Sequence, residues 1–402
     1  MQQLVIIGGG FAGLWAALVA AREAHVADRP LAITLVAPDD ALTVRPRLYE
    51  PFTPAFRAPF APLFEPLGIA QLRAHATDLD TVARCVRVQL ADGASRDLPY
   101  DRVVLAAGSR QAPLPVAGAA EHALDLDTYV AAERFHAHLA AVVAAPVSPA
   151  TSTFVVIGGG FTGIEMACEL RRHLRALGAT AAARDARVVL VERATEIGPE
   201  LGAGPRATIL EALQHCGVEL RLGAQVSRIE ADAVTFQDGE RLPCATTVIA
   251  TGLRAHPLTG GLGVELDGQG RLPVDEHLEV IGAPGVYAAG DLARARVDDA
   301  GHVALMSCQH AVPQGKHAGY NAAHALLGLA PRAYRQPDYV TCLDLGDYGA
   351  VFTTGWERTV AQAGADVKAL KQTVNTQWIY PPKGDLETLL AACDIDAPWP
   401  PV

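Results

Sequence analysis

Two glycine-rich segments have the residue types and spacing of a loop that binds phosphate. They are Gly8-Gly9-Gly10-Phe11-Ala12-Gly13 and Gly158-Gly159-Gly160-Phe161-Thr162-Gly163. In such a loop the first glycine makes the tight turn, the second lets the backbone approach a pyrophosphate, and the third lets the next helix pack close. The helix N-terminus then offers free N–H groups and a positive dipole end to the phosphates. One copy could be only a glycine-rich turn, but two copies, each after an apolar run, predict two bound dinucleotides.

Acidic residues after the second strand of each unit are the next candidates, because they normally bind the ribose hydroxyls of the nucleotide. Glu192 directly follows the expected strand 187–191. We expect it to bind the ribose of NAD and to repel a 2′-phosphate, which favours NADH over NADPH, although Arg193 could soften that preference. In the first unit Ala37 occupies this place, so either Asp39 or Asp40 substitutes or the contact is absent.

Further strand ends are placed to touch a cofactor. Ala106-Ala107-Gly108 and Ala250-Thr251-Gly252 lie at similar distances after their own glycine loops, which supports an internal duplication. Gly290-Asp291 ends another strand, and its carboxylate can accept a hydrogen bond from a ribityl hydroxyl; the alternative role is a helix N-cap. Arg45 and Ala76 complete the expected FAD contacts. These features predict a flavoprotein that passes electrons from a nicotinamide nucleotide to FAD.

The elements that position these residues read as two strand–helix–strand units, which predicts an α/β protein with two Rossmann-like dinucleotide-binding domains, inserted β-meanders and a small C-terminal α+β region. The expected elements are strand 3–7, helix 11–24, strand 31–36, a Pro-rich loop 45–66, a meander 84–105, a helical connector 116–152, helix 163–177, strand 187–191, a helix and strand within 205–223, and a meander 226–250. The expected domains are an FAD domain (1–115 and 280–330), an NAD(P)H domain (150–279) and a C-terminal region (331–402).

Composition narrows the possible partners. A net charge of −11 argues against nucleic-acid binding, which needs basic patches. No apolar run reaches the ~18 residues of a membrane span, and residues 2–7 read as a strand and not as a signal peptide, so a cytoplasmic protein is expected. The seven cysteines are widely spaced without a C-x-x-C pair, which suggests neither a zinc site nor a disulfide framework; no metal is expected.

With these motifs in place, the chain resembles the two-dinucleotide-binding-domain flavoproteins, and within them the type II NADH:quinone oxidoreductases, over roughly residues 1–383. Three segments carry the closer resemblance: Pro46-Arg47-Leu48-Tyr49-Glu50, Cys308-Gln309-His310-Ala311-Val312-Pro313-Gln314-Gly315 and Trp378-Ile379-Tyr380-Pro381-Pro382. The second is similar to the family's A-Q-x-A-x-Q-Q-G quinone-site motif. It departs from that motif at Cys308, where the family has Ala, and at Pro313, where the family has Gln, which predicts a reshaped pocket wall.

The resemblance implies FAD and NADH as cofactors, with NADPH as the alternative, and a quinone or similar small molecule as electron acceptor. It places Glu165 at the nicotinamide–flavin junction, although Glu165 could instead be a first-turn acid that complements the helix dipole. It pairs Lys371 with Glu165 across the flavin; Lys368 is the alternative. Gln309, His310 and Ala311 are expected at a helix N-terminus beside the flavin, with a packed role as the alternative for His310. Cys308 is expected to be an inert buried thiol.

Other functions remain open from the sequence. Disulfide reductases and sulfide:quinone oxidoreductases need cysteines at positions where this chain has none. A soluble NAD(P)H-dependent reductase or dehydrogenase of a specialised small molecule is a stronger alternative, and a slow-turnover flavin redox sensor is another. The acidic tail after Pro382 shows no basic amphipathic anchor, so any membrane contact is expected to be peripheral, at the inner face of the cell membrane. A homodimer is one possible assembly.

Overall fold

The first glycine loop joins the central strand of a parallel sheet to a buried helix, in a computed structural model that describes residues 1–398. Residues 399–402, which include Trp399 of the acidic tail, lie outside the described part. The strand after Gln3 is wholly apolar and buried, as a parallel sheet covered on both faces requires. The sheet has seven strands in the spatial order β19 (Val286–Ala288), β8 (Arg102–Leu105), β1 (Gln3–Ile7), β2 (Ala32–Ala37), β5 (Ala70–Asp80), β6 (Cys85–Leu90) and β7 (Ser95–Pro99).

The inserted meander of the first unit differs from the expectation in its membership. Strands β5, β6 and β7 pair antiparallel, and β5 was not expected from the sequence. The expected meander strand near residue 103 is instead β8, which pairs parallel with β1 and with β19. The apolar run at 103–105 reads equally well as a meander strand or a buried parallel strand, so periodicity alone did not separate the two.

The second unit repeats this plan on a smaller scale. Its sheet has the order β12 (Val218–Leu222), β11 (Arg187–Glu192), β10 (Thr153–Ile157) and β16 (Thr246–Ile249). Its antiparallel meander has the strands β13 (Val226–Ile229), β14 (Ala233–Phe236) and β15 (Arg241–Pro243). Again the last expected meander strand, β16, belongs to the parallel sheet beside β10.

The two glycine loops have the same backbone geometry, as a duplication predicts. Gly8 and Gly158 both have φ of +114°, and a Cβ on either would overlap the carbonyl oxygen of Ala106 or Ala250. The strands that follow these two carbonyls, β9 (Ser109–Gln111) and β17 (Leu253–Ala255), pair with each other and link the units. The remaining short pairs are β3 (Ala41–Thr43) with β4 (Arg57–Pro59) and β18 (Leu272–Pro273) with β20 (Ala293–Arg294).

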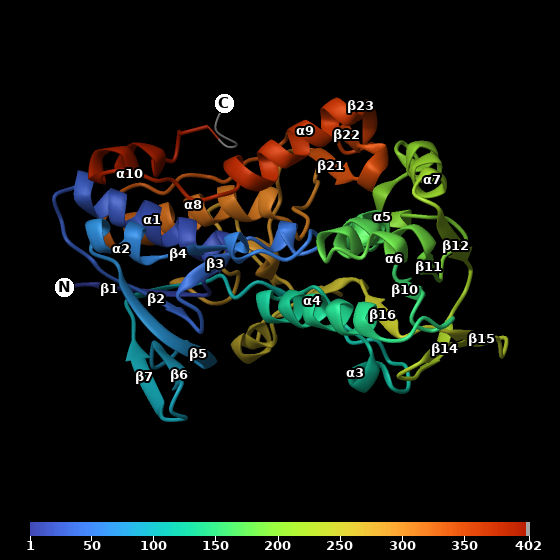
Figure 1. The fold of residues 1–402 in the computed structure, drawn as a ribbon. Coiled ribbons are helices and arrows are strands. Elements are labelled where there is room, and N and C mark those ends of the chain that lie inside the picture. The colour runs from blue at the N-terminus through green and yellow to red at the C-terminus, as the bar shows by residue number, and fades with distance from the viewer. Residues whose placement is uncertain (399–402) are drawn as a thin grey trace.

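Helix α1 (Phe11–Val26) packs closely against α8 (Cys308–Leu327), although the two are almost 300 residues apart in sequence (Figure 1). Glycines make this approach possible, because a Cβ on Gly315 or Gly319 would overlap the backbone of Ala12 or Ala16. The other α-helices are α2 (Ala61–Leu67), α3 (Ala119–His122), α4 (Tyr129–Ala144), α5 (Phe161–Ala176), α6 (Thr180–Asp185), α7 (Arg206–His215), α9 (Ala365–Thr373) and α10 (Leu386–Ala392).

The C-terminal region lies over both units. A sheet of β21 (Val340–Asp344), β22 (Ala350–Thr354) and β23 (Thr359–Gly364) leads into α9 and a π-helical turn (Val374–Trp378) beside the second unit, whereas α10 lies near α1 and α2 (Figure 1). The acidic tail folds onto basic residues: Arg22 Nε donates to the Leu390 carbonyl at 3.2 Å, and Lys316 Nζ to the Asp394 carbonyl at 3.2 Å. Within residues 1–398, no helix has the length and apolar composition to cross a membrane.

Candidate functional site

A cleft of about 1630 Å³ is lined by both units and by the C-terminal region. It brings together many of the residues that the sequence singled out: Arg45, Gly158, Gly160, Phe161, Thr162, Glu165, Glu192, Gly252, Gln309 and Lys371. Residues from the second glycine loop, the start of α8 and α9 therefore share one space. Such a cleft can hold the nicotinamide end of one nucleotide beside a second group.

The second glycine loop and Glu192 form the nucleotide end of the cleft. Gly160 is the N-cap of α5 and carries no side-chain cap, so the first N–H groups of the helix remain available to a ligand. Glu192 is buried, and its two carboxylate oxygens accept from the Gly159 N–H at 2.7 Å and the Ala194 N–H at 2.8 Å. These bonds fix the carboxylate beside the loop. Its contact with a ribose stays a prediction.

The first glycine loop has no such acid. The register of the two sheets makes Ala37 the structural counterpart of Glu192, because Val36 pairs with Ile7 as Val191 pairs with Ile157. Asp39 is exposed and its carboxylate lies 3.4 Å from Arg57 Nη2, with Asp40 at 3.0 Å from the same nitrogen. Neither carboxylate takes the place of Glu192, and the proposed contact of Asp39 with a ribose is untested.

Most of the remaining FAD candidates lie around the start of α1. Gly10 is the N-cap of α1, while Phe11, Ala12 and Gly13 are buried in its first turn, and Gly290 and Ala311 lie against each other beside Ala12. Ala107 and Gly108 follow β8, and Gly108 has a φ of +73°. Ala76 lies in β5 opposite Val88, beside a bulge.

Asp291 belongs to a compact polar cluster with Ser109, Arg45 and Asp127. Its Oδ2 accepts from the Ser109 hydroxyl at 2.5 Å and lies 3.6 Å from Arg45 Nη1. Arg45 also forms an ion pair with Asp127. Burial raises the pKa of Asp291, and Arg45 opposes that rise. Asp291 makes no N-cap hydrogen bond of the kind considered from the sequence.

Glu165 and Lys371 form a buried ion pair at the centre of the cleft wall. Lys371 Nζ lies 2.9 Å from Glu165 Oε1 and also donates to the Cys342 carbonyl at 2.9 Å. Burial raises the pKa of Glu165 to about 7, and the positive charge of Lys371 limits the rise. The pKa of Lys371 is raised because Glu165 and its neighbours outweigh the cost of burying the ammonium. Glu165 can therefore gain and lose a proton near neutral pH.

The structure corrects one detail of the sequence interpretation of Glu165. Helix α5 begins at Phe161, two residues earlier than expected, and its first turn contains no acidic residue. Glu165 therefore lies beyond the first turn, where the helix dipole no longer stabilises a carboxylate much. Its burial without that compensation favours a role in the cleft.

Further polar residues surround this pair, and one of them, Asp344, was not identified from the sequence. The backbone N–H of Asp344 donates to Glu165 Oε1 at 3.1 Å, and the carboxylate of Asp344 accepts from the Tyr49 hydroxyl at 3.0 Å. Lys368, the alternative partner for Glu165, instead pairs with Asp344 and Glu169. Tyr49 stood in a segment quoted for the family resemblance, whereas no sequence pattern marked Asp344, which reaches the site through the C-terminal sheet.

The start of α8 places Gln309, His310 and Ala311 at a helix N-terminus, with Ser307 as the N-cap. Gln309 lines the cleft, and its amide fits the backbone of Val340, with Nε2 donating to the Val340 carbonyl at 2.8 Å. His310 is fully buried, stacks on Tyr339 with centroids 5.6 Å apart, and shares a hydrogen bond with Gln336 Oε1 at 3.0 Å. This geometry agrees better with the packed alternative for His310.

Pro313 lies inside α8 and cannot donate to the Gln309 carbonyl. Gln336 Nε2 supplies the missing donor at 3.0 Å. Burial raises the pKa of the Cys308 thiol to about 11, so this thiol stays protonated at neutral pH. All seven cysteines carry free thiols, and the described residues hold no cluster of three or more His, Cys, Asp or Glu side chains suited to a metal ion.

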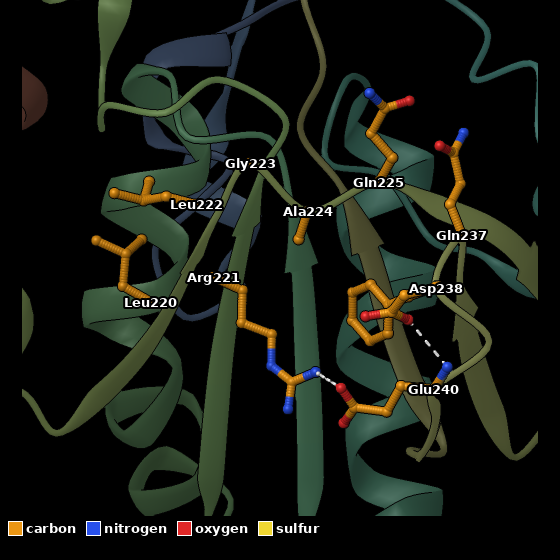
Figure 2. Close-up of a pocket in the computed structure, with 10 residues that line it drawn as sticks. Leu220, Arg221, Leu222, Gly223, Ala224, Gln225, Gln237, Asp238 and Glu240 are labelled. Carbon is orange, nitrogen blue, oxygen red and sulfur yellow. Dashed lines mark hydrogen bonds and ion pairs between the residues drawn. The ribbon is translucent and has the colours of Figure 1, made fainter.

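A smaller hollow of about 510 Å³ adjoins the nucleotide end and shares Ala224, Gln225 and Gln237 with the cleft. Figure 2 shows Arg221 and Glu240 pointing toward each other there, 2.8 Å apart, from β12 and the end of the turn between β14 and β15. This ion pair lines the hollow.

Comparison with known proteins identifies the family of this chain. A model of the family "pyridine nucleotide-disulphide oxidoreductase" matches residues 2–315. An NADH dehydrogenase-like protein of Mycobacterium tuberculosis is 44% identical over 98% of both chains. A type II NADH:quinone oxidoreductase of the same organism is 30% identical over 90% of this chain and 80% of its own. The solved structure of NDH2 from Plasmodium falciparum with NADH has a TM-score of 0.79 at 13% identity, over 99% of this chain and 98% of that one.

The family match covers both glycine loops and extends through the start of α8, and the more similar relatives are aligned over almost the whole chain. The chain therefore belongs to the pyridine nucleotide-disulphide oxidoreductase family, as an NAD(P)H-dependent flavoprotein oxidoreductase.

Proposed function

We propose that this protein oxidises NADH with FAD as its bound cofactor and passes the two electrons to a quinone. The observation that carries the proposal is one cleft that joins the second glycine loop and Glu192 to the Glu165–Lys371 pair and Gln309. FAD supplies the acceptor for the hydride and the donor of the two electrons. The protein supplies binding, orientation and electrostatics.

The residues of the first unit fit FAD. The first glycine loop and the uncapped N-terminus of α1 suit a pyrophosphate. Two buried polar atoms near the start of α8, Gln314 Nε2 and Ser307 Oγ, have no hydrogen-bond partner among residues 1–398. A buried donor without a partner is costly, so these atoms are suited to a polar ring system that accepts their hydrogen bonds. Asp291 offers a further acceptor for a hydroxyl.

In this proposal Glu165 holds the proton that a reduced quinone needs. Its pKa of about 7 leaves it partly protonated at neutral pH. Lys371 orients the carboxyl through the 2.9 Å contact, and the backbone of Asp344 holds the same oxygen. Gln309 lies at the N-terminus of α8, whose dipole favours negative charge that develops beside it.

The relatives support a quinone as the acceptor only through their own names. One is a type II NADH:quinone oxidoreductase, and another is a demethylphylloquinone reductase of Synechocystis, 27% identical over 95% of this chain and 97% of its own. Cys308 and Pro313 stand where the quinone-site motif has Ala and Gln. These departures favour the second candidate, an NAD(P)H-dependent reductase of another small molecule. We propose at most a peripheral contact with the membrane.

An acceptor screen tests the function. The purified flavoprotein is mixed with NADH, and the loss of NADH absorbance is followed with short-chain quinones, dioxygen and artificial dyes. Rapid, saturable turnover with a quinone supports the proposal. Reduction of the flavin by NADH followed by fast turnover with the dyes alone favours the second candidate, and a flavin that NADH fails to reduce contradicts both.

A further inference from the structure

The tip of the β22–β23 hairpin is held rigidly beside the cleft. Its turn, residues 355–358, is fixed to the chain that enters β21: the Gly355 N–H donates to the Tyr339 carbonyl at 2.8 Å, and Trp356 Nε1 to the Pro337 carbonyl at 3.1 Å. The Trp356 ring also stacks on His302, with centroids 4.5 Å apart. The side chain that follows on this turn is therefore presented in a fixed place.

That side chain is Arg358, whose backbone has a φ of +54°. Positive φ is uncommon for a residue with a side chain and clusters at functional positions. The guanidinium lies over the ring of Tyr339, 5.5 Å from its centroid, and the residue lines the cleft. Its Nη1 is buried, and no hydrogen-bond partner for it occurs within the described part of the chain.

A buried guanidinium nitrogen without a partner points to an anion that comes from outside the chain. Leaving a buried N–H donor of a cationic group without an acceptor is costly. The Tyr339 ring orients the guanidinium that lies over it, but the ring face is not a conventional hydrogen-bond acceptor for Nη1. A phosphate group can accept two parallel hydrogen bonds from the planar fork of donors.

The loop at 198–204 contacts the Arg358 backbone at one end and the second glycine loop at the other, and Arg358 lines the same cleft as that glycine loop. A Cβ on Gly204 would overlap the Arg358 carbonyl, and the Gly198 N–H donates to the Gly159 carbonyl at 3.1 Å. From this loop the carboxylate of Glu200 reaches the N-cap of α5, so close that a Cβ on Gly160 would overlap its Oε1. A carboxylate thus lies where the loop would receive the pyrophosphate.

We propose that Arg358 binds the pyrophosphate of the nicotinamide nucleotide, clamping it against the N-terminus of α5, and that Glu200 competes for the same place. The inference rests on the nucleotide site of the proposed function, whatever the acceptor is. The C-terminal hairpin then completes a site that the second unit alone leaves open on one side. Arg358 is a binding residue, and Glu200 leaves the loop when the nucleotide enters.

The test measures binding of ADP-ribose, which carries the pyrophosphate but transfers no electrons, to the FAD-loaded protein by isothermal titration calorimetry. Arg358→Asn removes the guanidinium and suits a positive φ, so the hairpin keeps its shape. We expect its Kd for ADP-ribose to rise about tenfold or more, the loss of a charge-assisted pair. Arg358→Lys should recover part of the loss, because it keeps the charge without the fork.

Glu200→Gln gives the opposite sign: we expect tighter ADP-ribose binding, because a competing negative charge is removed. Arg184→Gln is the matched control, since its side chain is 78% exposed and pairs with Asp185 on α6. It should leave the Kd unchanged within twofold. A merely structural role for Arg358 would lower the melting temperature of Arg358→Asn but leave the Kd for ADP-ribose at the wild-type value well below that temperature.

An unchanged Kd in Arg358→Asn would overturn the proposal, as would failure of the wild-type protein to bind ADP-ribose. Failure of the proposed function looks different. In that case NADH reduces the flavin but no quinone is reduced, while Arg358→Asn still weakens ADP-ribose binding. The quinone acceptor is then wrong, and the proposed role of Arg358 is supported.

Discussion

At the scale of single residues, burial is the main cause of the raised pKa of Glu165. The carboxyl is removed from water, and the ammonium of Lys371 lies 2.9 Å from it. The two effects oppose each other, and burial prevails, with a pKa of about 7. A group that titrates there can give up a proton to a product and regain it from solvent at neutral pH.

We predict that Glu165→Gln lowers kcat with a quinone by about 100-fold, the contribution of a positioned proton donor. The wild-type rate should fall as pH rises through about 7, because the neutral carboxyl disappears, whereas the variant should show no inflection there. Stopped-flow reduction of the flavin by NADH should change little. Glu23→Gln is the control, since Glu23 is equally buried but pairs with His324, outside the cleft. A pH profile that survives in Glu165→Gln would assign the titration to another group.

The same carboxyl predicts a pH effect on stability. Glu165 keeps its proton to about pH 7 in the folded protein, whereas in the unfolded chain it ionises near its ordinary 4.5. Between these pH values the folded state binds more protons than the unfolded chain. The contribution of Glu165 to the free energy of unfolding therefore falls as pH rises. In urea unfolding, Glu165→Gln should therefore gain stability relative to wild type from pH 4.5 to 7. A constant difference across that range would show that the pKa is not raised.

Glu192 sets the expected choice of nucleotide. Its carboxylate is fixed by two backbone N–H groups, and a 2′-phosphate beside it would be repelled. We predict that the wild-type protein prefers NADH and that Glu192→Gln raises the ratio of kcat/KM for NADPH over NADH by about tenfold, or about 1.4 kcal/mol. Steady-state rates with both nucleotides check this. Asp39→Asn, on the exposed counterpart loop of the first unit, should leave the ratio unchanged. A wild-type preference for NADPH would contradict the assignment.

At the scale of elements, α8 depends on a side chain from another segment. Pro313 leaves the Gln309 carbonyl without its helical donor, and Gln336 bonds to that carbonyl, to the His310 ring and to the Tyr334 hydroxyl. One amide thus compensates for the proline and orients the residue next to Gln309. The departure from the quinone-site motif is therefore accommodated locally, and the helix continues to Leu327.

We predict that Gln336→Leu destabilises the protein by about 1–3 kcal/mol, the cost of leaving buried polar groups unpaired. Pro313→Ala should recover part of this loss in the double variant, because it restores an N–H to the Gln309 carbonyl. Denaturant unfolding of the four proteins gives the coupling directly. Strictly additive effects would show that Gln336 does not compensate for the proline.

The local patterns predicted the glycine loops, the acid at Glu192 and the helix start near Gln309, because each lies within one strand–turn–helix segment. Periodicity did not assign β8 and β16, since a short apolar run fits a meander and a parallel strand equally. Arg358 and Asp344 could not be found in this way. They come from a C-terminal sheet that reaches the cleft by long-range packing, and nothing in their own neighbourhood of the sequence signals a ligand.

At the scale of the whole molecule, the two duplicated units share their backbone geometry but differ in the side chains around the glycine loops. Both loops share the φ of +114° at the first glycine, but only the second unit has an acid at the strand tip. The C-terminal region adds a second inequality, because Lys371 and Arg358 reach the second unit whereas α10 packs on the first. The C-terminal region therefore packs on two units that otherwise have separate hydrophobic cores.

We predict that the same Leu→Ala change at two positions of this C-terminal region affects the binding of two different ligands. Leu389 on α10 belongs to the core of the first unit, and Leu345 after β21 belongs to the core of the second. Each Leu→Ala change should cost about 2–5 kcal/mol in unfolding, because both side chains are almost fully buried. Leu389→Ala should release FAD more readily, measured as free flavin fluorescence, with ADP-ribose affinity unchanged. Leu345→Ala should weaken ADP-ribose binding and keep its flavin. If both variants lose both ligands in parallel, the C-terminal region stabilises the molecule as one unit and the division between the two cores has no functional meaning.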